Sequence, residues 1–297
     1  MSNQNNKLMR LPIIISRFSN LLFFVQKTNQ GRLAGFDLQK HLADNIDLSF
    51  YRKTESEIWK QIRKSIGEQN TEQFKKVIIP IRPIFASHWK KASKNLLLWK
   101  QYFQNNQFLF QRTIFEVKKL SGIKHFAIAK IPIYFISNPI SKNREIDAWF
   151  SWAPKKKIIV VEIPLGLEPP SSFFPISVLV HEFFHLILIK NKKLFSVITK
   201  ITKENEKLFT KLSKRMPNRL FLEELLISSF VPEGYLSEKY LYTKVSSCIR
   251  KPTDLLTWRE FVAYKLYQTA KKYTNENREI DEEYIKNLIE LIKQNVK

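Results

Sequence analysis

Cysteine is nearly absent from this sequence, since Cys248 is the only one among 297 residues. One cysteine cannot form a disulfide within the chain, and it cannot build a zinc cluster from several thiolates. A metal ion held by this chain alone must therefore be bound by histidine and carboxylate side chains. We expect Cys248 itself to be a small buried apolar residue rather than a reactive thiol.

Acidic residues are also scarce, because 27 aspartates and glutamates face 50 lysines and arginines, which gives a net charge of +23. Such an excess suits nucleic acid, an anionic membrane surface or acidic proteins as partners. The basic residues, however, are mostly lysines spread over the whole length, without an arginine-rich block or a known nucleic-acid-binding module. We interpret the charge as a solvated basic surface, and nucleic acid is an alternative partner that no motif supports.

The sequence has no apolar run of the roughly 20 residues that a membrane span needs. Its most apolar stretch, residues 173–189, is shorter and has three polar side chains in its middle, so we expect a buried core helix. The apolar patches near the N-terminus are interrupted by Arg17 and Asn20, and no signal-peptide cleavage site follows them. These missing signals and the single cysteine predict a cytoplasmic protein without a membrane span.

Two kinds of local pattern predict the fold class. Apolar residues at three- and four-residue spacing predict helices, and short β-branched runs predict a small sheet. We therefore expect an α+β fold that is mainly helical, with a helical region at residues 1–122 and a second domain at residues 123–297. The expected strands are 131–136, 148–152 and 157–163, and the expected helices are 47–66, 93–120, 172–189 with Ser172 as its cap, 192–214, 220–230, 253–273 and 277–295.

One segment carries a pattern with a chemical interpretation, His181-Glu182-Phe183-Phe184-His185. Residues four apart lie on one face of an α-helix, so the two imidazoles can bind the same metal ion. Glu182 lies about 100° around the helix, outside the coordination sphere but near enough to take a proton from an activated water. Apolar residues flank the motif on both sides, and unpartnered polar groups are costly in a buried helix. The pattern predicts a zinc centre, and a core helix with hydrogen-bonded histidines is the alternative.

A third protein ligand is expected downstream, because a catalytic zinc normally has three protein ligands and one open position. Glu223 and Glu224 lie in an apolar helix, where an acidic pair is out of place unless one member faces a cation. We favour Glu224, because Ser228 follows it by four residues and could hydrogen-bond the ligand. Glu223 is the alternative, and Glu233 in the following turn is a third candidate for which a structural or substrate-side role fits better.

With these residues the chain resembles the gluzincin branch of the zincin metallopeptidases, over about residues 131–236. The resemblance implies a small zincin-like sheet packed on the active-site helix. The strand at 157–163 would be the edge strand that lines the substrate cleft, and a peptide substrate would add to it as an antiparallel strand. It also implies that zinc polarises the scissile carbonyl while Glu182 activates the attacking water.

Two features depart from the gluzincin pattern. The family commonly has an acidic residue four positions after the ligand glutamate, where this chain has Ser228. The family also uses a downstream His, Tyr or Arg to stabilise the oxyanion, and no histidine follows His185 in this chain. Tyr235, or in second place Tyr240, would then take that role.

The predicted function is hydrolysis of peptide bonds in a peptide or protein substrate by a zinc-dependent metallopeptidase. Two alternatives stay open. The first is a zincin-like module that binds metal and acts in regulation or interaction without catalysis, and the second is a basic nucleic-acid-associated protein. An intramembrane protease, in which the same motif lies in a spanning helix, is a further alternative.

Overall fold

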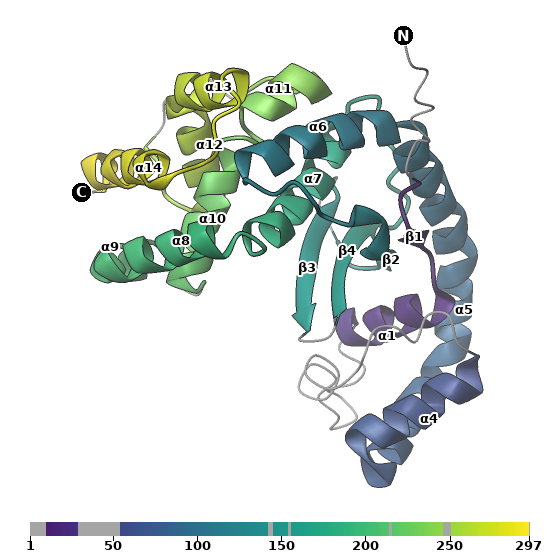
Figure 1. Cartoon of the computed structure of the whole chain (residues 1–297). Coiled ribbons are helices and arrows are strands. Elements are labelled where there is room, and N and C mark those ends of the chain that lie inside the picture. Colours follow the sequence, from purple (N-terminus) through teal and green to yellow (C-terminus); the bar gives the residue numbers. More distant parts are fainter. Residues whose placement is uncertain are drawn as a thin grey trace. The chain divides into compact units, whose positions relative to one another are not determined.

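The structure is a computed structural model of the chain (Figure 1), and it describes residues 10–28, 54–141, 145–153, 156–213, 216–245 and 251–296. Cys248 and the first part of the helix expected at 47–66 lie outside the described residues. The chain forms two compact units, which we call the sheet unit (Arg10–Asn105 and Ile128–Pro169) and the helical unit (Asn106–Ala127 and Pro170–Lys297). Each unit combines separate stretches of the chain, whereas the sequence predicted two consecutive segments. The domain boundary at residue 122 stays a prediction.

The sheet unit contains a four-stranded mixed sheet in the order β1-β2-β4-β3, in which β1, β2 and β4 are parallel and β3 is antiparallel to β4. Ile133 of β2 and Phe150 of β3 pair with Ile159 from either side, so β4 is an inner strand. The expectation that residues 157–163 form an edge strand to which a substrate adds is therefore wrong, because both sides of β4 are already hydrogen-bonded. The three predicted strands are confirmed to within two residues at each end. The strands are β1 (Ile13–Ile14), β2 (Ile133–Asn138), β3 (Asp147–Ala153) and β4 (Lys156–Pro164).

Among its described residues, the sheet unit also contains three α-helices. The buried Asn20 fastens the first of them to β2, because its amide donates to the Phe135 carbonyl at 3.2 Å and accepts from the Ser137 N–H at 2.7 Å. Thr54 and Glu57 form a capping box at the start of the second. The helices are α1 (Arg17–Lys27), α4 (Glu55–Ile66) and α5 (Glu68–Asn105), so the helix predicted to begin at residue 93 begins 25 residues earlier.

The helical unit is built around α7 (Phe174–Leu188), whose residues are buried from Leu179 to Leu188. A helix that is apolar on every side must lie in a core, and here aromatic contacts from Phe110 and Phe230 surround it. Phe173 occupies the N-cap position of α7, so the prediction of Ser172 as the cap is wrong. The other helices are α6 (Gln107–Leu120), α8 (Lys192–Glu204), α9 (Glu206–Ser213), α10 (Asn218–Ser228), α11 (Tyr235–Leu241), α12 (Leu255–Lys265), α13 (Tyr267–Asn275) and α14 (Glu282–Asn295).

The expected fold class is confirmed: the chain is α+β and mainly helical, with a small mixed sheet. Three predicted helices are each two helices, broken at Asn106, Asn205 and Leu266. Within the described ranges, no helix by itself combines the length and apolar composition for a membrane crossing, and α7 with α8 meets that test only as a pair bent by 93°.

Candidate metal centre

The helix α7 places the two histidines of the motif on one face. Their ring centroids lie 4.8 Å apart, and the two Nε2 atoms approach to 3.1 Å. The helix is continuous through the motif, since neither Pro nor Gly interrupts it and the apolar residues before and after His181 and His185 are buried. The local pattern therefore determines the relative position of the two imidazoles.

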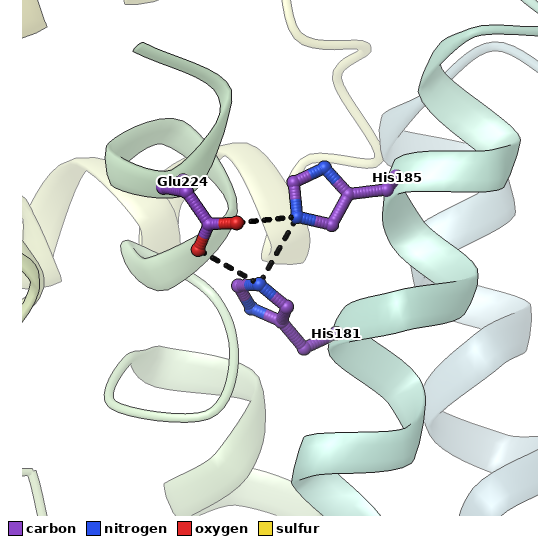
Figure 2. Close-up of side chains that lie close together, drawn as sticks. All are labelled: His181, His185 and Glu224. Atoms are coloured by element: carbon purple, nitrogen blue, oxygen red, sulfur yellow. Dashed lines mark hydrogen bonds and ion pairs between the residues drawn. The ribbon is translucent and has the colours of Figure 1, made fainter. Parts of the chain in front are cut away.

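Glu224 of α10 brings a carboxylate to the same point (Figure 2). Its Oε2 atom lies 3.1 Å from Nε2 of His181, and its Oε1 atom lies 3.1 Å from Nε2 of His185. One ligand atom from each of the three residues lies within 4.8 Å of the others. The side chains of His181, His185 and Glu224 are only 4%, 1% and 14% exposed. Of the three glutamates considered from the sequence, the structure brings Glu224 to the Nε2 atoms.

Glu223 contacts the opposite side of His185. Its Oε2 atom lies 3.6 Å from Nδ1 of that imidazole, and its Oε1 atom pairs with Arg219 one turn earlier in α10. The Nδ1 atom of His181 faces the carbonyl oxygen of Val231 at 3.2 Å. His181 thus has a hydrogen-bond acceptor at Nδ1, the arrangement that orients metal-binding histidines. Nδ1 of His185 has the Glu223 carboxylate at ion-pair distance, slightly too far for a hydrogen bond.

The space between the two Nε2 atoms and the carboxylate of Glu224 requires a positive charge. With hydrogen on each Nδ1, two nitrogen lone pairs and a carboxylate point at one another, which a proton or a metal ion must compensate. Burial lowers the pKa of His185, but the carboxylates of Glu223 and Glu224 outweigh burial and raise that pKa to about 9. Burial lowers the pKa of His181 despite the nearby Glu224. A metal ion fits this donor set in place of the proton, because two imidazole nitrogens and a carboxylate oxygen are typical zinc ligands.

Glu182 is buried on α7 beside the first histidine, with a relative exposure of 7%. Its negative charge is one of the influences that raise the pKa of His185, so it acts electrostatically on the cluster. This carboxylate does not belong to the group that the three candidate ligands form.

An arginine that the sequence pattern did not identify adjoins the third ligand. Arg259 of α12 donates from Nε to the hydroxyl of Ser228 at 2.8 Å, and its Nη1 atom lies 3.7 Å from Oε2 of Glu224. Its Nη2 atom pairs with Glu233 at 2.9 Å. Ser228, expected to hydrogen-bond the ligand, instead accepts from Arg259, which lies next to the ligand. No local spacing relates α12 to the motif, so only the tertiary structure reveals this contact.

The two candidate tyrosines, Tyr235 and Tyr240, contact residues of other helices. The hydroxyl of Tyr235 donates to Asn275 at 3.2 Å, and its ring packs edge-on against Tyr267. The ring of Tyr240 lies 4.7 Å from the guanidinium carbon of Arg112. Neither tyrosine belongs to the cluster of ligand atoms, and a role in oxyanion stabilisation stays a prediction.

Comparison of the chain with protein-family models, with curated protein sequences and with solved structures finds no match. The resemblance to gluzincins inferred from the motif and the downstream glutamates therefore stays a prediction.

Proposed function

We propose that this chain is a zinc-dependent metallopeptidase in which His181, His185 and Glu224 hold the metal and Glu182 is the general base. The observation that carries the proposal is the convergence of two Nε2 atoms and a carboxylate within 4.8 Å of one another. Nδ1 of His181 also has a backbone acceptor, as metal-binding histidines do, and a carboxylate lies 3.6 Å from Nδ1 of His185. The proposed substrate is a peptide or protein, and the proposed cytoplasmic location rests on the sequence alone.

Three protein ligands would leave one coordination position of a tetrahedral zinc open, as in catalytic sites. Zinc bound there would supply Lewis-acid chemistry, since it polarises a carbonyl and lowers the pKa of water toward neutrality. Glu182 would accept the proton of the attacking water and pass it to the leaving amine. Its position next to His181 on α7 suits that role, because a residue one place along a helix cannot share the ligand face.

Metal content tests the first half of the proposal. We expect one zinc per chain in the purified wild type, and we expect His181→Ala to lose it because one of two imidazole ligands is gone. A wild type without stoichiometric zinc, or a zinc content unaffected by His181→Ala, would refute the metal centre.

Hydrolysis of a mixed peptide library tests the second half. We expect cleavage by the wild type and retention of zinc without cleavage in Glu182→Gln, because the amide cannot take the proton. Glu238→Gln is the matched control, since it changes an exposed glutamate of α11 whose carboxylate accepts from Tyr267. Equal activity of the wild type and Glu182→Gln would exclude Glu182 as the base.

The burial of the ligands favours a second candidate function, a zincin-like metal-binding module without catalysis. Side chains that are 1% and 4% exposed suit a structural metal site, which needs no access for substrate. If the wild type and Glu182→Gln both hold zinc and neither cleaves any peptide of the library, this function replaces the enzymatic one.

A further inference from the structure

Arg259 makes three separate contacts around the candidate metal centre. Each of its three guanidinium nitrogens has a different partner: the hydroxyl of Ser228, the carboxylate of Glu224 and the carboxylate of Glu233. The first two partners belong to α10, and the third belongs to the loop at residues 229–234. The side chain is only 20% exposed, so these contacts are largely shielded from solvent.

The same loop orients one of the histidines. Val231 lies two residues before Glu233 in this loop, and its carbonyl oxygen faces Nδ1 of His181 at 3.2 Å. The loop backbone is compact, since a Cβ atom on Gly234 would lie 2.1 Å from the carbonyl oxygen of Ser229. The close packing of this loop therefore leaves little room for Glu233 to move without also shifting Val231.

Arg259 is thereby linked to two of the three candidate ligands. It contacts Glu224 directly, and through Glu233 it holds the loop whose carbonyl orients His181. The planar guanidinium suits this task, because it presents donors in fixed directions and stays charged at every relevant pH. A lysine has the charge but cannot reach three partners in three directions at once.

We propose that Arg259 is a positioning residue of the metal centre, which fixes the carboxylate of Glu224 and the loop behind His181 and so sets metal affinity and coordination geometry. The inference rests on the proposed function, since it assumes that His181, His185 and Glu224 bind a metal. Arg259 acts through the ligands and does not itself bind the ion.

The test compares full-length wild type, Arg259→Met and Arg259→Lys for zinc affinity and for the absorption spectrum of the Co²⁺-loaded protein. We expect zinc affinity to fall by about 10- to 100-fold in Arg259→Met, the range typical of residues that support metal ligands. The cobalt d–d bands should shift, because they report the geometry of the ligands. Arg259→Lys should restore part of the affinity and leave the spectrum altered.

Arg278→Met is the matched control, because Arg278 is also paired with two carboxylates of the helical unit, Asp281 and Glu283. We expect wild-type affinity and a wild-type cobalt spectrum from it. Glu233→Gln keeps the test informative if Arg259→Met does not fold, since it removes only the link to the loop and should weaken zinc binding in the same direction. The losses in Arg259→Met and Glu233→Gln should be less than additive in the double variant, because the contact between Arg259 and Glu233 is lost in Arg259→Met already.

Three results would overturn the inference. Arg259→Met with wild-type affinity and spectrum would show that the contacts do not position the ligands. Full recovery of both readouts in Arg259→Lys would show that charge alone matters. Unchanged zinc affinity in Glu233→Gln would show that the contact between Arg259 and Glu233 does not support metal binding. A wild type that binds no zinc would instead refute the proposed function, so the two failures are distinguishable.

Discussion

Replacing Glu223 by glutamine tests the roles of the two neighbouring glutamates of α10, of which the sequence favoured Glu224 as the ligand. Glu223 is 1% exposed and lies 3.6 Å from Nδ1 of His185, whereas Glu224 faces the Nε2 atoms. The variant keeps the shape of the side chain and removes the negative charge behind His185. Because that charge strengthens the imidazole as a metal ligand, we expect zinc affinity to fall by about 10- to 100-fold, or about 1.4 to 2.7 kcal/mol.

The same change should also destabilise the metal-free protein. Arg219, which Glu223→Gln leaves behind, is 36% exposed and can be solvated in place. The variant also removes one of the carboxylates that raise the pKa of the buried His185, however, and a buried charge that loses a partner is costly. We therefore expect the free energy of unfolding of the metal-free variant to fall by about 1 to 3 kcal/mol.

The assay is competition for zinc with a chromophoric chelator, together with urea unfolding of the metal-free proteins. Glu224→Gln is the matched comparison, because it is the same substitution one residue further along the same helix. Loss of a ligand should exceed the effect of Glu223→Gln and take the affinity beyond the 100-fold range of supporting residues. An equal or larger loss in Glu223→Gln would make Glu223 the ligand and refute the reasoning.

Three further predictions concern the proposed base Glu182, the loop residue Gly234 and Asp281, the N-cap of α14. Glu182→Gln should lower kcat by about 10²- to 10⁴-fold with zinc content unchanged, as expected for a general base; a normal kcat at full zinc content would contradict this. Gly234→Ala should destabilise the fold by about 1 to 3 kcal/mol in urea unfolding, because its Cβ would collide with the Ser229 carbonyl. Asp281→Ala should cost about 1 kcal/mol by removing the cap of α14. Burial raises the pKa of Asp281, but hydrogen bonds from the first turn of α14 and from Arg278 lower it below its usual value. The stability that it contributes is therefore complete above the unfolded pKa of about 3.9 and is lost as pH falls through the lower folded pKa, so wild type and variant should converge in strong acid.

The elements predicted well from the sequence are those with a strong local signal. The strand at residues 157–163 is a continuous β-branched run, and it appears as β4 with one extra residue at each end. The helix breaks at Asn205 and Leu266 were missed, because neither residue is Gly or Pro and the apolar spacing continues across both. The two-residue β1 was also missed, since a strand that short has no period to detect.

One part of the candidate site was likewise predictable from a local sequence pattern, and another part was not. The relation of His181 to His185 is a property of one helix, so spacing alone predicted it. Choosing between Glu223 and Glu224 needed the packing of α10 against α7, because both glutamates lie in the same apolar segment. No sequence pattern indicated Arg259, because its partners lie at least 26 residues earlier in the chain and no helical or strand periodicity connects them to it.

Coordination and catalysis make different demands on this centre. Coordination needs three donors, a compensating charge and oriented imidazoles; the cluster supplies the three donors, and the Val231 carbonyl and the Glu223 carboxylate lie beside the two Nδ1 atoms. Catalysis needs in addition that a scissile carbonyl reach the metal. Glu224 is the most exposed of the three ligands at 14%, so an approaching substrate would arrive from its side. Arg259 contacts Glu224 and is paired with Glu233, so under the proposed function a substrate that passes Glu224 would come close to this ion pair.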